Sequence, residues 1–200
     1  MLINEMGELI VEKQFLNEQS VILDSFKLGA AIYSSGFRPT FIVGLWRGGS
    51  TIGIYVQECL QTLGVETDHI ALRTSYQGLS HYQETLDVPD PKIRVHGTQY
   101  LLETLNAEDR LLIVDDVLST GRNVTAVISR LKSHLKRNMP NEVKVAALWH
   151  RPSHDKTGLQ PDFSLYVTQN WLVFPYELNG LTVEEIQLHK PFVTVGRQVI

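Results

Sequence analysis

Segments with the pattern of buried strands alternate with segments with the pattern of amphipathic helices along most of this chain. Apolar runs of strand length occupy residues 40–45, 65–73, 110–114, 143–149 and 163–167. Apolar side chains at helical spacing occupy residues 21–33, 50–63, 98–105 and 122–137. Because a helix between two strands lets both run in the same direction, the alternation predicts an α/β fold with a mostly parallel, twisted sheet flanked by helices.

The size and charge of the chain argue against several other classes of protein. Its 200 residues are enough for one substantial core, so we expect a single domain over residues 1–200. The net charge of −4 argues against broad nucleic-acid binding, which needs a basic face. Cys59 is the single cysteine, so neither an internal disulfide nor a four-cysteine zinc site can form.

Nothing in the sequence predicts a membrane segment or a secretory signal. No apolar run approaches the roughly 18 residues that a membrane helix needs. The N-terminal segment carries acids and lacks the basic start of a secretory signal. A cytoplasmic protein without a membrane partner is therefore the simplest expectation.

The most informative motif is the run LLIVDDVLSTGRN at residues 111–123. Its four apolar residues predict a buried strand, and Asp115 and Asp116 come where we expect that strand to end, at the ligand-binding edge of an α/β sheet. The Ser-Thr-Gly that follows opens a helix, where free backbone N–H groups and the helix dipole favour an anion. A carboxylate pair suits sugar hydroxyls or a hydrated Mg²⁺, and the turn suits a phosphate. The alternative is that both acids only cap the helix, a role that does not need two consecutive acids.

This run resembles the signature with which type I phosphoribosyltransferases bind phosphoribosyl pyrophosphate (PRPP), over all 13 positions. The resemblance covers most of residues 20–180 and implies the type I phosphoribosyltransferase fold. That fold has a core, here over about residues 20–167, and a small hood from about residues 168–180 and possible terminal segments. The resemblance implies that Asp115 and Asp116 are catalytic residues that hold the ribose hydroxyls and share in binding Mg²⁺. It also implies that the 5′-phosphate is bound by the loop of Ser119, Thr120, Gly121, Arg122 and Asn123.

A second glycine-rich loop, GLWRGGST at residues 44–51, follows the first expected strand. It nearly spells a P-loop, but Ser50 stands where the lysine that contacts the nucleotide would be, which argues against ATP or GTP hydrolysis. The Arg-Gly-Gly instead resembles the pyrophosphate-binding loop of the same family, although such a tripeptide is often only a tight turn. The resemblance implies that Arg47 supplies catalytic positive charge to the leaving pyrophosphate. Gly48 and Gly49 would expose backbone N–H groups to it.

The stretch from residue 74 to residue 96 is dominated by polar residues and fits neither a strand nor a helix. It can be a tolerated surface insertion or an active-site lid. A lid covers PRPP in the family, and the resemblance implies that Thr74, Ser75 and Tyr76 belong to it. Such a lid would exclude water, which would otherwise trap the oxocarbenium-like ribosyl centre.

The run TQNWLVFPYE at residues 168–177 resembles the hood of xanthine–guanine and hypoxanthine phosphoribosyltransferases. The resemblance implies that Trp171 and Leu172 contact the base, with the indole stacked on it, and that Glu177 binds Mg²⁺. Ordinary core packing of Trp171 and a solvated charge at Glu177 are the alternatives. Arg151 stands where purine-specific members carry a lysine before a proline, so it would donate to the purine O6 carbonyl unless it is a surface arginine.

Ser119 departs from the pattern of many 6-oxopurine enzymes, which carry an aspartate there to accept the N7 proton of the base. Serine is a poor general base because its pKa lies far from neutrality. Three explanations stay open. The base can be acidic, as xanthine and orotate are; another residue, such as Asp116 or His81, can accept the proton; or catalysis has been lost while nucleotide binding remains.

These features together predict an enzyme that transfers the phosphoribosyl group of PRPP to a nucleobase, with Mg²⁺ as cofactor. A 6-oxopurine (hypoxanthine, guanine or xanthine) is the expected base, in purine salvage, ahead of orotate or adenine. Family members are commonly dimers or tetramers, which implies a homodimer or homotetramer here. The alternative is a regulatory protein on the same fold that binds PRPP or a nucleotide with weak or no transferase activity.

Overall fold

The computed structural model describes residues 13–76, 92–195 and 198–199. The chain divides into two compact units, and each is treated separately below. Unit 1 consists of residues 1–21 and 170–200, and unit 2 of residues 22–169. None of the helices in the described ranges is both long and apolar enough to cross a membrane.

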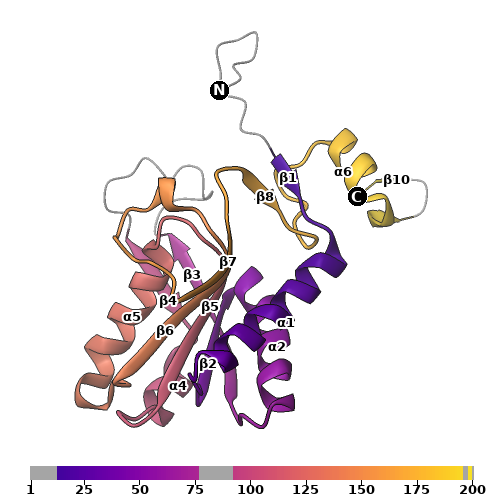
Figure 1. The fold of residues 1–200 in the computed structure, drawn as a ribbon. Coiled ribbons are helices and arrows are strands. Elements are labelled where there is room, and N and C mark those ends of the chain that lie inside the picture. Colours follow the sequence, from indigo (N-terminus) through magenta and orange to yellow (C-terminus); the bar gives the residue numbers. More distant parts are fainter. Residues whose placement is uncertain (1–12, 77–91, 196–197, 200) are drawn as a thin grey trace. The chain divides into compact units, whose positions relative to one another are not determined.

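Unit 2 is built on a six-stranded sheet with the strand order β4-β3-β2-β5-β6-β7 (Figure 1). Neighbouring strands run parallel except β4, which is antiparallel to β3. The strands are β2 (Phe41–Trp46), β3 (Asp68–Tyr76), β4 (Ile93–His96), β5 (Arg110–Leu118), β6 (Glu142–His150) and β7 (Phe163–Val167). The predicted mostly parallel α/β sheet is thus confirmed.

Helices cover both faces of this sheet (Figure 1). They are α1 (Glu18–Ser34, whose first four residues belong to unit 1), α2 (Gly48–Thr62), α4 (Gln99–Thr104) and α5 (Arg122–Leu135). Two of these helices end at a glycine: Gly36 follows α1 with φ of 87° and Gly64 follows α2 with φ of 81°. Glycine adopts this left-handed conformation without the steric cost that a Cβ would add.

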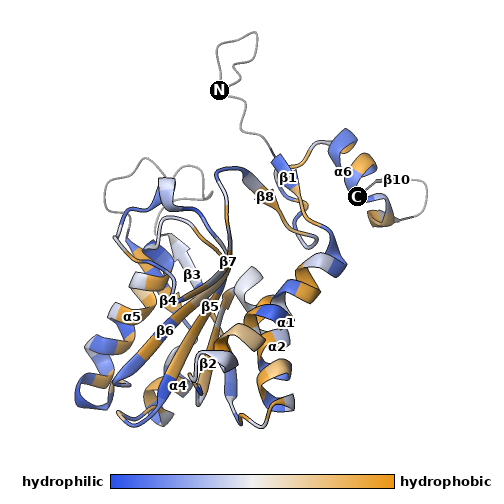
Figure 2. Cartoon of the chain, in the orientation of Figure 1, coloured by the Kyte–Doolittle hydropathy of each residue, from blue (hydrophilic) through white to orange (hydrophobic). Residues whose placement is uncertain are grey.

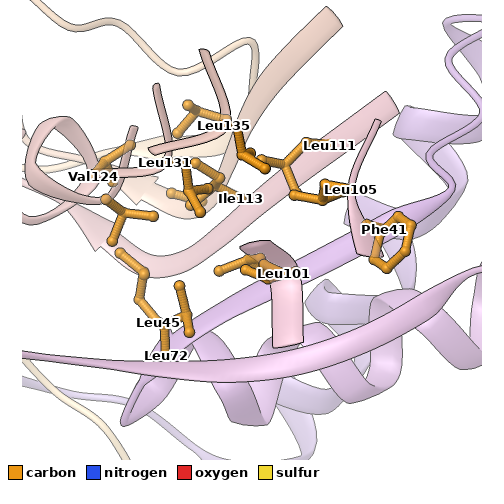
Figure 3. Packing of buried hydrophobic residues seen from close by; sticks show 14 of the residues in the cluster. Phe41, Leu45, Leu72, Leu101, Leu105, Leu111, Ile113, Val124, Leu131 and Leu135 are labelled. Carbon is orange, nitrogen blue, oxygen red and sulfur yellow. The ribbon is translucent and has the colours of Figure 1, made fainter. Parts of the chain in front are cut away.

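The strands carry apolar residues on both faces because both faces are covered. On β2 and β5, Val43 and Ile113 join the cluster under α4 and α5, and both are fully buried. Figure 3 shows side chains of this cluster converging, among them Leu45 and Leu131. Figure 2 shows the same separation over the whole unit, with hydrophobic strands inside and hydrophilic residues on the outer sides of the helices.

Two sequence expectations differ from the structure at the ends of strands. We expect β5 to end before Asp115, but it continues to Leu118. The reason is its pairing with β6, which extends to Leu118 opposite His150. The stretch from residue 74 to 96 was expected to be irregular, but its ends are β-structure, with residues 74–76 of β3 paired to 93–95 of β4. Residues 77–91, which include His81, lie outside the described residues.

Unit 1 joins the two ends of the chain. Its β1 (Lys13–Phe15) pairs in parallel with β8 (Trp171–Val173), and α6 (Val183–His189) follows. Thr182 and Glu185 form a capping box at the start of α6, and Lys13 forms an ion pair of 2.8 Å with Glu185. A short 3₁₀ turn (Pro191–Val193) leads to the two-residue strands β9 (Thr194–Val195) and β10 (Gln198–Val199).

The largely buried imidazole of His69 makes the stability of the fold depend on pH. Its Nδ1 lies 3.1 Å from Oε1 of Gln57 on α2, and burial lowers the pKa of His69 despite the opposing charge of Asp68. Below about pH 6.5 the unfolded chain therefore binds a proton at this position that the folded chain does not. We expect the free energy of unfolding to fall as the pH falls from 7.5 to 5.5, and to fall less in His69→Gln. Equal pH slopes in urea denaturation would contradict this assignment.

Candidate active site

The turn between β5 and α5 forms a small pocket at the carboxyl end of the central strand. Gly121 has φ of 72° and directly precedes α5, and its carbonyl accepts the N–H of Thr125 at 3.0 Å. The N–H of Arg122, the first residue of α5, donates to Oγ1 of Thr120 at 3.4 Å, and the positive end of the helix dipole at this turn favours an anion. The pocket is lined by Asp115, Val117, Leu118, Ser119, Thr120, Gly121, Asn123 and Val124.

Two polar atoms beside this pocket are buried without a hydrogen-bond partner among the described residues: Oγ of Ser119 and Oδ1 of Asn123. A buried polar atom without a partner is costly, so these two atoms mark a place where the polar groups of a ligand would be stabilised. The Ser119 hydroxyl can donate to a phosphate oxygen. The Asn123 amide can do the same once it is turned to present its NH₂ group.

The two acids lie side by side on β5, next to this turn. The backbone N–H of Asp116 donates to Oδ1 of Asp115 at 3.0 Å, and that of Val117 donates to Oδ1 of Asp116 at 2.8 Å. Burial, and after it the negative charge of Asp116, raises the pKa of Asp115 well above its usual range. When both carboxylates are charged they repel each other, and hydroxyl donors or a cation would reduce this repulsion.

This acid pair fits the Mg²⁺ that the resemblance implies. Within the described ranges, no group of three or more His, Cys, Asp or Glu side chains could hold a metal ion by itself. Mg²⁺ that acts on phosphates is usually held by one or two carboxylates together with the substrate phosphates, so two adjacent carboxylates suit it.

The loop between β2 and α2 lies directly against the first acid. Arg47, which is exposed, connects the two elements through a cis peptide bond with Trp46, and Gly48 and Gly49 begin α2. A Cβ at position 49 would lie 2.2 Å from the carbonyl oxygen of Val114 and 2.9 Å from Cα of Asp115. Glycine at position 49 thus lets the start of α2 touch the backbone of β5. The Arg-Gly-Gly loop therefore packs against the strand that carries both acids and leads into the Ser-Thr-Gly turn.

Residues at the end of β6 complete this edge of unit 2. The backbone N–H of Arg151 donates to the carbonyl of Leu118 at 2.9 Å, and its Nη2 lies 3.5 Å from the carbonyl oxygen of Gln169. Arg151 is only 7% exposed, so the surface-arginine alternative is wrong. The sequence analysis did not assign His150, the residue before Arg151, to the site. Its Nε2 is buried without a partner among the described residues. The position of His150 at the end of a strand, next to Arg151, was the only sequence signal for a role in the site.

The other predicted residues lie in β3 or in unit 1. Thr74, Ser75 and Tyr76 end β3, and Oγ of Ser75 lies 2.9 Å from Nε2 of His96 on β4. In unit 1, Trp171 and Leu172 belong to β8. Leu172 is buried, and one carboxylate oxygen of Glu177 accepts the N–H of Phe174 at 2.9 Å.

The model of the phosphoribosyl transferase domain matches residues 12–179, which include both glycine-rich loops and both acids. The chain belongs to the phosphoribosyltransferase family. It is 23% identical over 199 residues to a hypoxanthine-guanine phosphoribosyltransferase of Streptococcus agalactiae, with 98% of each chain covered. It is 26% identical over 145 residues to the human phosphoribosyltransferase domain-containing protein 1, covering 72% of this chain and 61% of that protein.

The fold is also that of solved phosphoribosyltransferases. A purine phosphoribosyltransferase from Pyrococcus horikoshii superposes with a TM-score of 0.62 at 23% identity, covering 85% of this chain and 97% of that one. The expected type I phosphoribosyltransferase fold is confirmed.

Gly121 provides a test of the phosphate-binding turn. A Cβ there would need a left-handed backbone and would lie 2.1 Å from Oγ1 of Thr157. We expect Gly121→Ala to weaken binding of PRPP and of ribose 5-phosphate about tenfold, because strain of 1–2 kcal/mol displaces the N–H groups. Gly158 has a similar φ of 74° but open space around it, so Gly158→Ala is the matched control and should bind both compounds normally. Calorimetric titration measures the affinity of both variants for PRPP and ribose 5-phosphate. Equal affinities in the two variants would show that the turn does not bind the phosphate.

Proposed function

We propose that this chain transfers the 5-phosphoribosyl group of PRPP to a 6-oxopurine base, hypoxanthine, guanine or xanthine, as in purine salvage. The products would be a nucleoside 5′-monophosphate and pyrophosphate. The observation that carries the proposal is the contact between the start of α2 and β5: Gly49 lies against the backbone of Asp115, on the strand that leads into the anion-binding turn. A carboxylate pair between two anion sites matches a ribose between a 5′-phosphate and a pyrophosphate.

Each part of PRPP has a counterpart in unit 2. The 5′-phosphate would accept N–H and hydroxyl bonds from residues 119–123, and the ribose hydroxyls would donate to Asp115 and Asp116. Arg47 and the N–H groups of Gly48 and Gly49 would bind the pyrophosphate and stabilise the negative charge that develops as it leaves. Mg²⁺, when bound, would neutralise part of the charge on the pyrophosphate, with Asp115 and Asp116 as its protein ligands.

For the base, the proposal carries over the roles that the resemblance implies. Arg151 would donate to the O6 carbonyl, Trp171 and Leu172 would contact the ring, and Glu177 would share in holding Mg²⁺. Thr74, Ser75 and Tyr76 would belong to the part that excludes water. Ser119 is no general base, so the protein would favour a base that gives up its proton readily, or would use another acceptor.

The test is product formation from PRPP and Mg²⁺ with hypoxanthine, guanine, xanthine, adenine, orotate and uracil, each supplied separately. A nucleoside monophosphate from one or more 6-oxopurines, identified by chromatography, supports the proposal. Product from orotate alone would overturn the choice of base.

Ser119 favours a second candidate, a regulatory protein on the same fold that binds PRPP or a nucleotide without efficient transfer. The two candidates differ in one measurable respect. The regulator would bind PRPP in calorimetry but form no product with any base. A cytoplasmic location and a homodimer or homotetramer remain part of the proposal and can be tested by cell fractionation and by light scattering.

A further inference from the structure

A buried lysine holds the turn of unit 1 that contains Glu177. Lys190 directly follows α6 and is 3% exposed. Its Nζ donates to the carbonyl of Phe174 at 2.7 Å and to that of Pro175 at 3.1 Å. Burial lowers the pKa of Lys190, and the charge of Glu177 opposes this shift. A lysine is rarely buried unless its ammonium group has fixed partners, and here those partners are two consecutive carbonyl groups.

Both the backbone and the side chain of Glu177 bond to Phe174 at the start of the turn that Lys190 contacts. The N–H of Glu177 donates to the carbonyl of Phe174 at 3.0 Å, and the N–H of Phe174 donates to Oε2 of Glu177 at 2.9 Å. The carbonyl of Phe174 therefore accepts both the turn's own N–H and the ammonium of Lys190. The Phe174 side chain is 1% exposed and stacks on Tyr176, so a buried ring anchors the turn.

Lys190 is itself held in place by the helix that precedes it. Its N–H donates to the carbonyl of Ile186 at 2.8 Å, at the end of α6. That helix is tied to β1 by the ion pair between Lys13 and Glu185 and by the stacking of Phe15 on His189, with ring centroids 3.7 Å apart. The ammonium group thus reaches the turn from a fixed point, and the turn cannot shift without breaking charge-assisted hydrogen bonds.

We propose that Lys190 is a positioning residue that fixes the Phe174–Glu177 turn and thereby sets the affinity of the hood for the base. This inference rests on the proposed function, in which the segment from Trp171 to Glu177 contacts the base and Mg²⁺. Lys190 touches neither the base nor the metal in this proposal. It acts through the backbone of the turn that presents Glu177.

The test uses Lys190→Met, which keeps the length of the side chain but removes its charge. We expect the KM for the base to rise about tenfold or more, because methionine cannot donate the charge-assisted hydrogen bonds that hold the turn. The KM for PRPP should rise less than the KM for the base, because the residues that would bind its phosphates and ribose belong to unit 2 and only Glu177 would act on it from unit 1, through Mg²⁺. Lys190→Arg, which keeps the charge and the donors, should restore much of the affinity.

Lys27→Met is the control, because it removes another lysine and its ion pair with Asp24 but lies on α1 in unit 2, whereas α6 and the turn belong to unit 1. It should leave both KM values near wild type. A similar rise in the KM for the base in both variants, or an unchanged KM in Lys190→Met, would overturn the proposal.

Hydrogen exchange tests the role of Lys190 independently of activity, and also applies if wild type forms no product. The amide of Glu177 should exchange at least about tenfold faster in Lys190→Met than in wild type, while the α6 amides keep their protection. Unchanged exchange at Glu177 would refute the positioning role, whereas faster exchange in a protein that transfers to no base would refute only the proposed function. If Lys190→Met does not fold, Lys190→Gln, which keeps N–H donors but not the charge, takes its place. Faster exchange at Glu177 and a raised KM for the base would then support the proposal, and no change in either would overturn it.

Discussion

Replacing both Asp115 and Asp116 by asparagine will lower the rate of phosphoribosyl transfer by about a thousandfold or more, because charge stabilisation in a closed site is usually the largest catalytic effect. The asparagine pair keeps the size of both side chains and the acceptors for the backbone N–H groups of Asp116 and Val117. What it removes is the negative charge that would bind Mg²⁺ and accept the ribose hydroxyls. Steady-state pyrophosphate release with saturating PRPP, Mg²⁺ and base measures the loss.

The fold of this double variant should be at least as stable as that of wild type at pH 8. The raised pKa of Asp115 shows that burial next to Asp116 disfavours its charged form, so removing both charges removes an unfavourable interaction. Chemical denaturation of both proteins provides this control. Turnover at the wild-type rate by a folded double variant would refute the catalytic role of the acid pair.

Gly49→Ala will strongly lower activity by separating the start of α2 from the strand that carries the two acids. The added Cβ would meet the carbonyl oxygen of Val114 at 2.2 Å, and this neighbour is backbone in the centre of the sheet, so α2 must move instead. We expect kcat/KM to fall about a hundredfold, since a displacement of about 1 Å can cost that much. The overpacking should lower the free energy of unfolding by about 1–3 kcal/mol.

Gly64→Ala, at the other end of the same helix, separates the loss of stability from the loss of activity. Gly64 has φ of 81° and open space around it, so alanine there strains only the backbone, by about 1–2 kcal/mol. The two variants should therefore lose comparable stability, and only Gly49→Ala should lose activity. Equal kcat/KM values would show that the contact between α2 and β5 is not part of the site.

Local sequence patterns were sufficient for most of unit 2. The strand at Phe163–Val167 has the predicted bounds, and β2, α2 and α5 begin within two residues of their predicted starts. These elements could be predicted because their apolar periodicity and their stop signals lie within the element itself. The extension of β5 through both acids could not, because it depends on the partner strand β6 rather than on the residues of β5.

Local sequence patterns could not predict the contacts between residues that are distant in the sequence. Lys190 is separated by 16 residues from Phe174, and β1 pairs with β8 across most of the chain. The motifs placed Gly49 in a loop and Asp115 at the end of a strand, and only the structure shows that their backbones touch. Likewise, the burial of Arg151 follows from its place between the ends of β5 and β7, which its polar neighbours in the sequence do not reveal.

The central claim is that the acid pair and the two loops of unit 2 form one PRPP site, and calorimetric competition tests it most directly. With Mg²⁺ present, ribose 5-phosphate and pyrophosphate should each bind and each be displaced by PRPP, because each would occupy one half of the site. They should not displace one another. Failure of PRPP to bind, or displacement of pyrophosphate by ribose 5-phosphate from a single shared position, would contradict the account.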